Sequence, residues 1–279
     1  MRAARRRSGD LLDERRLAED LELAGIRPGD TVCVHSSLSS IGNVAGGAQG
    51  VIRALMGAVG ERGTILMPAY GTAEAAIRAS SDGTPIDLRT EPSQTGKITE
   101  VFRQTPGVLR SSHPFSSVCA WGAHAEYLTS AHDADERICH PDSPLARFWS
   151  LGGKVLGLGV SLGPISFYHV VEDTWDAFPF NPYGESVEIR YLDARGIEVT
   201  RRVAYYDRKL TPFRIDADGG LAVRRKMTEH LRSGGLLHEF PFGDAASWWF
   251  SARQVYAELQ ALATRGTTIY AETPARSIV

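Results

Sequence analysis

Apolar and polar positions alternate along the chain in a way that predicts helices and strands in turn. The segment "LLDERRLAEDLELAGI" carries Leu17, Leu21 and Ala24 at helical spacing, and "TVCVHSS", after the break at "RPGD", is typical of a buried strand. The next apolar segment, "VIRALMGAVG", predicts a helix that ends near Gly60, and "GTILMPAY" predicts a second strand. This order of strand, loop, helix and strand indicates an α/β layered fold.

The same alternation continues through the middle of the chain. "TGKITEVFRQTPG" predicts a helix, "SSVCAWG" a strand, "AHAEYLTSAH" a helix and "KVLGLGV" a strongly buried strand. Between the last two, "DSPLARFWSLGG" predicts a helix with Ser143 as its N-cap and Pro144 at its first position.

The pattern changes after about residue 187. "SVEIRYLDARGIEVTRRVAYY" predicts a solvent-facing hairpin that turns at "DARG", so we expect antiparallel strands beside parallel ones. "DAASWWFSARQVYAELQALATRG" predicts the last long helix. Because no repeat, low-complexity linker or charge block divides the chain, we expect one domain over residues 1–279, with residues 1–9 as a flexible basic arm.

Composition narrows the class of partner. A chain of 279 residues with 43% hydrophobic content can bury a full-sized core, and its net charge of -2 gives no reason to expect nucleic acid or an anionic membrane. A small-molecule substrate is favoured instead. Cys33, Cys119 and Cys139 are odd in number and lack CxxC spacing, which argues against disulfides and structural zinc and favours a reducing cytoplasm. No apolar run approaches the roughly 20 residues that span a bilayer.

"GVSLG", residues 159–163, lies between a strand and an expected helix, which is the context of the G-x-S-x-G nucleophile elbow. Ser161 is therefore a candidate nucleophile, and Asp207 with His230 or His238 would complete the order of acid and histidine. The proline that follows the motif argues against it, because the helix should begin there with a free backbone N–H. A serine hydrolase remains an alternative.

Two polar stretches lie near the first predicted strand. "GNVAGGAQG", residues 42–50, opens a helix whose N-terminal amides can hold phosphate, although its glycine spacing matches neither the dinucleotide nor the Walker pattern. "VHSSLSS" places Ser36, Ser37 and Ser39 at a strand end that faces this loop. These groups either bind an extended ligand or satisfy the backbone of a structural turn.

"RSSHPFSSVCAWG" brings Arg110, His113 and Ser116 together at the entrance to a strand. A His-Pro pair is typical of a rigid extended corner, and an ordinary buried histidine is the alternative to a functional one. Since HExxH is absent and no second histidine lies at ligand spacing, we expect no metal site.

"GPISFYHVVEDTW", residues 163–175, holds a histidine and a glutamate three positions apart. If the stretch is helical, His169 and Glu172 share one face and the carboxylate can contact the imidazole. Such a carboxylate fixes the tautomer and stabilises the imidazolium, so the histidine is a poised proton acceptor. A surface pair of little consequence is the alternative.

Taken together, "VHSSLSSIGNVAGG", "GTILMPAY", "PGVLRSSHPFSSVCAWG", "DSPLARFWSLGGKVLGLGV" and "YHVVE" resemble the aminoglycoside 3-N-acetyltransferase family, coenzyme A-dependent antibiotic acetyltransferases distinct from the GNAT superfamily. The resemblance runs from about residue 12 to about residue 265. It implies a layered α/β/α fold with a mixed sheet, acetyl-CoA as donor, an amine of an aminocyclitol or amino sugar as acceptor, and a role in antibiotic resistance. Whether the chain forms a homodimer stays open.

The resemblance also implies roles for individual residues. His169 and Glu172 would be the catalytic pair, with His169 as general base in a direct transfer that forms no acyl-cysteine. The coenzyme side would be lined by His35, Ser36, Ser37, Arg110, Ser112, His113, Ser116 and Ser117. The acceptor side would be lined by Tyr70, Asp173 and Asp176.

Residues 171–188 contain five carboxylates and no lysine or arginine, with Trp175, Phe178 and Tyr183 among them. Such a surface suits a polycationic sugar, because carboxylates pair with ammonium groups and rings stack on sugar faces. A solvated loop is the alternative. A biosynthetic N-acyltransferase that acts on a different small amine also remains open.

Overall fold

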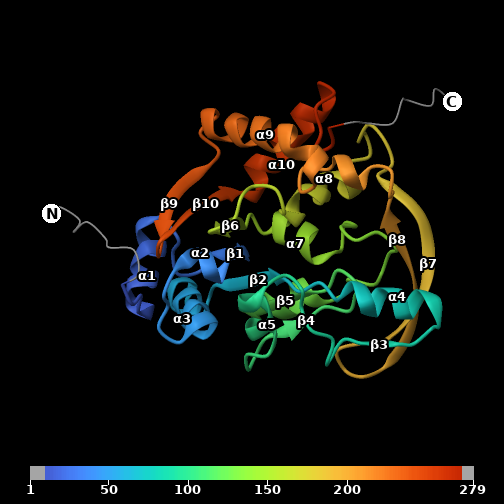
Figure 1. Cartoon of the computed structure of the whole chain (residues 1–279), viewed down its shortest axis with the longest axis horizontal. Coiled ribbons are helices and arrows are strands. Elements are labelled where there is room, and N and C mark those ends of the chain that lie inside the picture. Colours follow the sequence, from blue (N-terminus) through green and yellow to red (C-terminus); the bar gives the residue numbers. More distant parts are fainter. Residues whose placement is uncertain (1–9, 272–279) are drawn as a thin grey trace.

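The computed structural model describes residues 10–271 and is built around a seven-stranded mixed sheet (Figure 1). The strand order is β4-β5-β2-β1-β6-β10-β9. The central strands β2, β1 and β6 are parallel, whereas β5 and β10 pair with them in antiparallel fashion. The strands are β1 (Thr31–Ser36), β2 (Thr64–Pro68), β4 (Leu109–Arg110), β5 (Val118–Gly122), β6 (Lys154–Leu158), β9 (His238–Phe242) and β10 (Ala245–Ser251).

Helices cover both faces of this sheet, as β1 shows in its side chains. Val32 and Val34 belong to one buried cluster and Cys33, which points the opposite way, belongs to the other. The first cluster is closed by α1, α3 and α5 and the second by α7, α8, α9 and α10, so the expected α/β/α layering is confirmed. The helices are α1 (Glu14–Leu23), α2 (Leu38–Ile41), α3 (Gly47–Val59), α4 (Ala73–Ser81), α5 (Lys97–Arg103), α6 (Ala125–Thr129), α7 (Pro144–Ser150), α8 (His169–Thr174), α9 (Leu221–Ser233) and α10 (Ala252–Thr264).

The predicted helix ends are confirmed at α3 and α7. The helix α3 ends at Val59, and Gly60 follows with φ 64°, a conformation that favours glycine. The hydroxyl of Ser143 accepts a hydrogen bond from the backbone N–H of Ala146, and Pro144 takes the first position of α7.

A second, three-stranded sheet contains the predicted hairpin. It consists of β3 (Ile86–Asp87), β7 (Tyr183–Leu192) and β8 (Glu198–Tyr206), and the hairpin turns at "DARG" as expected. The hairpin is solvent-facing on one face only, because Ile189 and Tyr191 are buried in a small core. That core includes residues of α4, so the hairpin is anchored to the rest of the chain.

The expectation of one long helix from residue 244 onward is wrong in its first third. Ala245–Ser251 forms β10, antiparallel to both β6 and β9, and the helix α10 begins only at Ala252. The adjacent indoles show why: Trp248 donates to the carbonyl of Val160, whereas Trp249 donates to the carbonyl of Ala24. Consecutive side chains that point to opposite faces require a strand, so sheet pairing overrides the local helical pattern.

Gly157 in β6 is expected to be intolerant of a side chain. An ideal Cβ there would lie 2.1 Å from Cε2 of Trp248, because the indole lies over the glycine. We expect Gly157→Ala to lower the free energy of unfolding by about 1–3 kcal/mol through overpacking. Urea unfolding measures this change, and Gly57→Ala is the control.

Gly57 is an exposed helical glycine with no heavy atom within 4 Å of its ideal Cβ. Gly57→Ala should therefore be neutral or raise stability by up to about 1 kcal/mol. A Gly157→Ala protein as stable as the Gly57→Ala protein would show that Trp248 can move away freely.

No helix in residues 10–271 combines the length and apolar character needed to cross a membrane. The expected basic arm, residues 1–9, lies outside the residues that the structure describes.

Candidate active site

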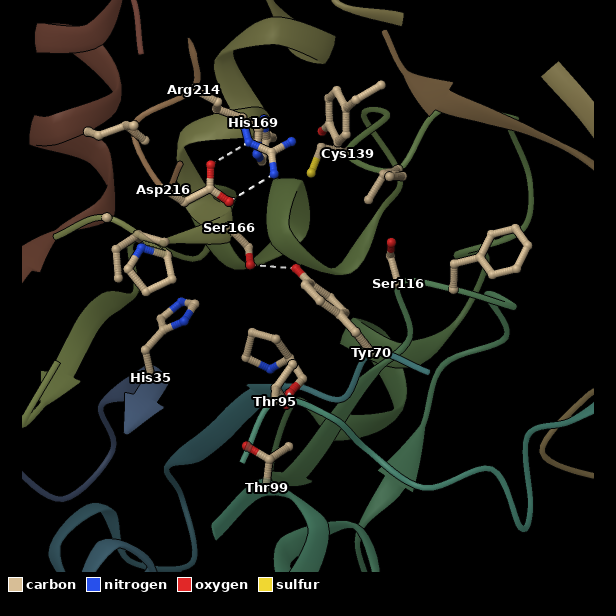
Figure 2. Close-up of a pocket in the computed structure, with 18 of the residues that line it drawn as sticks. His35, Tyr70, Thr95, Thr99, Ser116, Cys139, Ser166, His169, Arg214 and Asp216 are labelled. Atoms are coloured by element: carbon tan, nitrogen blue, oxygen red, sulfur yellow. Dashed lines mark hydrogen bonds and ion pairs between the residues drawn. The ribbon is translucent and has the colours of Figure 1, made fainter. Parts of the chain in front are cut away.

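A cavity of about 500 Å³ lies at the carboxyl ends of β1, β2 and β6. Open α/β sheets bind their ligands at this edge. The first residue of α8 and the last residues of β8 close the cavity from the other side, and the segment Arg214–Asp216 adds a charged wall (Figure 2). The central sheet and the hairpin thus both contribute to one recess.

His169 and Glu172 form the predicted contact in this recess. His169 opens α8, and its Nδ1 lies 2.7 Å from Oε2 of Glu172. The Glu172 side chain is fully buried, whereas the His169 side chain is 14% exposed and lines the cavity. Because Nδ1 is occupied by the carboxylate, Nε2 is the ring nitrogen left for a substrate.

Aromatic rings enclose the pair. The ring centroid of Tyr206 lies 4.5 Å from that of His169, and Tyr206 stacks on Tyr183 at 5.0 Å. Burial raises the pKa of Tyr183, of Tyr206 and of Tyr270 well above the usual value of a phenol. The phenols therefore stay neutral at physiological pH and add no competing anion.

Arg214 and Asp216 form an ion pair in the cavity wall that the sequence did not indicate. The guanidinium donates from Nε and Nη2 to the two carboxylate oxygens at 2.6 and 2.8 Å. Burial alone would raise the pKa of Asp216, but the hydrogen bonds and charge of Arg214 outweigh it and the pKa is lowered. Asp216 is therefore an anion that faces the same space as the imidazole.

Three residues expected on the coenzyme side line the cavity: His35, Ser36 and Ser116. Ser37 and Ser112 are not part of its wall. The hydroxyl of Ser37, which precedes α2, instead bonds the hydroxyls of Ser39 and Ser40 in that helix.

Arg110 and Ser117 lie behind the wall and hold loops in place. The hydroxyl of Ser117 donates to the carbonyl of Ala69, and Nε of Arg110 donates to that same hydroxyl. The remaining guanidinium donors reach the backbone carbonyls of Ala69, Leu88 and Glu91. These bonds fix the loop that follows β2.

His113 is buried, and it positions Ser116. Its Nδ1 accepts hydrogen bonds from the backbone N–H groups of Phe115 and Ser116, at 3.2 and 2.9 Å. Its ring lies 4.8 Å from that of His132, which is also buried. These bonds therefore hold Ser116 at the cavity wall, while the imidazole of His113 itself stays in the interior.

This buried pair predicts acid sensitivity. Burial, with a smaller contribution from His140, lowers the pKa of His113 to about 3, and burial lowers the pKa of His132 well below its usual value. Unfolded histidine titrates near 6.5, so each neutral imidazole contributes full stability above that pH and loses it progressively below. At pH 5.5 the loss is about 1.4 kcal/mol for each histidine. Urea unfolding at pH 7.5 and 5.5 measures it.

A matched pair of variants tests whether the loss of stability in acid comes from the buried histidines. His113→Asn keeps an acceptor for the two N–H groups but cannot titrate, so it should lose less stability on acidification than the unsubstituted protein. His124→Asn, at an exposed histidine, should behave like the unsubstituted protein. An equal acid response in both variants would contradict the assignment to the buried pair.

Of the residues expected on the acceptor side, Tyr70 lines the cavity and donates its hydroxyl proton to Ser166. Asp173 is buried outside the wall and accepts from the backbone N–H of Cys139 and the hydroxyl of Tyr183, at 2.8 and 2.6 Å. Burial raises the pKa of Asp173 to about 6. Asp176 is exposed beyond the cavity wall.

The structure does not assemble the groups of a serine hydrolase. Ser161 is exposed, and its hydroxyl accepts only from a backbone N–H within residues 10–271. His230 is paired with Glu258 at 2.7 Å, and His238 stacks on an indole at 3.9 Å between ring centroids. Asp207 caps a turn. None of these groups bonds another, so the geometry favours the chemistry of His169.

The three thiols are free and buried, and that of Cys139 lines the cavity. Burial raises the pKa of Cys33 and of Cys119 to about 12, and that of Cys139 well above its usual value. These protonated thiols are poor nucleophiles. In the described part of the chain, no group of three or more histidine, cysteine or acidic side chains is arranged to hold a metal ion.

Comparison with known proteins assigns the class that this fold and site define. The model of the family described as aminoglycoside 3-N-acetyltransferase matches residues 33–264. Aminoglycoside N(3)-acetyltransferase VII of Streptomyces paromomycinus is 35% identical over 265 residues, which cover 90% of this chain and 91% of the relative. Acetyltransferase VIII of Streptomyces fradiae is also 35% identical, with coverage of 88% and 94%.

Solved structures agree. AAC-IIIb in a binary complex with CoASH has a TM-score of 0.79 and 27% identity, over 95% of this chain and all of that one (100%). AAC-VIa bound to sisomicin has a TM-score of 0.77 and 26% identity, over 94% and 100%. The chain belongs to the aminoglycoside 3-N-acetyltransferase family. It is an acetyl-CoA-dependent enzyme of that type, and the family likeness supports a role in antibiotic resistance.

Proposed function

We propose that this enzyme transfers the acetyl group of acetyl-CoA directly to an amine of an aminoglycoside or a related amino sugar, with His169 as general base. The observation that carries the proposal is the imidazole that lies between a buried carboxylate and an open cavity. The relatives support it, because one was solved with CoASH and another with sisomicin.

The chemistry requires a base at this position. An alkylamine is mostly protonated at neutral pH, so a proton must leave before the nitrogen lone pair can attack the thioester carbon. In the proposal, Nε2 of His169 takes that proton while Glu172 holds Nδ1–H and stabilises the imidazolium. Both substrates are bound together, and the buried thiol of Cys139 stays protonated as a wall of the cavity.

The wall offers recognition groups for both substrates. We assign the side of Ser36 and Ser116 to the pantetheine arm and the side of Tyr70 to the acceptor. The carboxylate of Asp216 faces the same cavity and is the group suited to an ammonium of the acceptor. The free, buried cysteines fit the reducing cytoplasm that we propose as the compartment.

Release of free thiol from acetyl-CoA tests the proposal. We expect release to depend on an added aminoglycoside and to be slow with water or a simple monoamine. Ser161→Ala should transfer acetyl groups at the unsubstituted rate, because Ser161 lies outside the cavity wall. A rate of thiol release that is the same with and without every amine tested would contradict the assignment. So would hydrolysis of an ester that Ser161→Ala abolishes.

A further inference from the structure

His35 lies in the centre of the sheet and faces the same cavity as His169. It is the fifth residue of β1, which lies between the parallel strands β2 and β6, and it lines the cavity at their carboxyl ends. Figure 2 shows its ring directed from β1 into the recess, on the opposite side from His169 and α8. A substrate held between the two imidazoles would be contacted from both sides.

The protein gives the ring of His35 no polar partner at Nε2. This nitrogen is buried and makes no hydrogen bond to any side chain or backbone group that the structure describes. The neighbour of His35 on β6 is Gly157, and the indole of Trp248 lies over that glycine. The neighbouring position on β6 therefore offers no polar side chain to the imidazole. Leaving a buried polar group unpaired costs stability, so its retention points to a ligand that completes the bond.

The same surroundings determine which chemistry the ring can perform. Burial lowers the pKa of His35 to about 4, so the ring is neutral at physiological pH. A neutral ring that resists protonation is a poor base, but it remains a hydrogen-bond donor when its proton is on Nε2. The two histidines of the cavity thus differ: His169 is paired with a carboxylate, whereas Nε2 of His35 has no hydrogen-bond partner among the described residues.

We propose that His35 donates a hydrogen bond from Nε2–H to the carbonyl oxygen of the bound acetyl thioester and stabilises the negative charge that develops there. The inference rests on the proposed acetyl transfer and adds the electrophilic group to it. A preorganised neutral donor in a dry site stabilises an oxyanion without the cost of reorganising solvent.

The atoms balance through the step. The nitrogen lone pair of the acceptor attacks the thioester carbon, the N–C bond forms, and the carbonyl π electrons move to oxygen. The amine enters this step neutral, since the proton that His169 took from its ammonium form has passed on to solvent, and His169 takes a second proton from nitrogen as the N–C bond forms. The oxygen lone pair then re-forms the C=O bond, the C–S bond breaks, and the leaving thiolate takes the proton from the imidazolium of His169. His35 keeps its proton throughout, so it acts as an electrophile only.

Two substitutions of His35 separate the effect of its hydrogen-bond donor from the effect of the space that its ring fills. His35→Phe keeps a ring in the same space and removes both nitrogens, whereas His35→Gln keeps an N–H donor. We expect His35→Phe to lower kcat by about 10²–10³-fold, with acetyl-CoA affinity changed by less than about threefold. We expect His35→Gln to recover at least about tenfold of that loss.

The Tm of His35→Phe distinguishes a catalytic His35 from a histidine that only supports the fold. If Nε2 is unpaired in the free enzyme, His35→Phe should raise the Tm or leave it unchanged, because an apolar atom replaces an unsatisfied polar one. A structural histidine would instead lower the Tm when replaced. A gain in stability together with a loss of turnover is therefore the expected combination.

The carbonyl stretch of bound acetyl-CoA tests the contact without any acceptor amine. With acetyl-CoA labelled with ¹³C at the carbonyl, we expect the band of the bound thioester to lie at lower frequency than in solution, and to return toward the solution value in His35→Phe. An unchanged band in His35→Phe, or a kcat within about threefold of the unsubstituted enzyme, would overturn the inference. Failure of the proposed function looks different, because the unsubstituted enzyme would then show no amine-dependent thiol release.

Discussion

Replacing His169 with glutamine is expected to lower kcat for acetyl transfer by about 10³-fold, within the 10²–10⁴-fold range of general base catalysis. Glutamine fills similar space and can still reach Glu172, but it cannot accept the proton of the acceptor amine. The loss should appear in kcat rather than in acetyl-CoA affinity, because the substitution removes an interaction of the transition state. Steady-state thiol release and calorimetric titration with coenzyme A measure the two quantities.

The chain contains a matched control for this experiment. His230 and Glu258 form a second histidine–glutamate pair with the same 2.7 Å separation, on α9 and α10 and outside the cavity wall. His230→Gln removes an imidazole from an equivalent contact, so it should leave kcat within about twofold. If His169→Gln retained normal turnover, or if both variants lost it equally, the assignment of the base to His169 would be wrong.

The two pairs also show what the sequence can and cannot distinguish. The pair on α8 is predictable, because a spacing of three residues in a helix brings the side chains together. The pair formed by His230 and Glu258 joins two helices and has no local signal. What separates the catalytic candidate from the surface pair is burial of the carboxylate and an adjoining cavity, and both depend on tertiary packing.

In the fold, too, the sequence predicts the elements that local patterns determine, but not those that depend on distant neighbours. Strands such as β1 and helices such as α3 follow from apolar runs and glycine stops, and they are confirmed. The sequence does not predict the strand β10, because "AASWWFS" has no strong alternation of polar residues and only pairing with β6 and β9 makes it a strand. Local pattern is a weak guide wherever sheet neighbours decide the conformation.

The sequence does not predict that Arg214 and Asp216 line the cavity, and the reason is again a long-range contact. Arg214 and Asp216 lie in a segment without periodicity, next to a short 3₁₀ turn. Backbone hydrogen bonds to the C-terminal residues hold that segment over the cavity, since Ile215 N–H donates to Ile269 and Ala271 N–H donates to Phe213. The side chains reach the site only because two distant stretches pair.

Glu172→Gln is expected to have the second largest effect, a fall in kcat of about 10²–10³-fold. The carboxylate of Glu172 can only accept at Nδ1, which places the imidazole proton there and leaves Nε2 as the acceptor for the amine proton. A glutamine amide can either accept or donate, so part of the enzyme would hold the opposite tautomer with Nε2 already protonated. The imidazolium formed in the reaction would also lose its counter-charge at a buried position, where water does not replace the carboxylate.

The comparison of glutamine with aspartate at this position separates the two contributions. Glu172→Asp keeps the charge but shortens the side chain. Its kcat should be clearly higher than that of Glu172→Gln if the charge dominates. The two values should be similar if the 2.7 Å contact with Nδ1, which fixes the tautomer, dominates. Glu258→Gln, the equivalent change in the surface pair, should leave kcat unaffected. Burial explains why the first substitution matters and the second does not: the Glu172 side chain is 0% exposed and that of Glu258 is 28% exposed. Water replaces a lost counter-charge only at the surface, so equal losses in Glu172→Gln and Glu258→Gln would remove the physical basis for a carboxylate-assisted base.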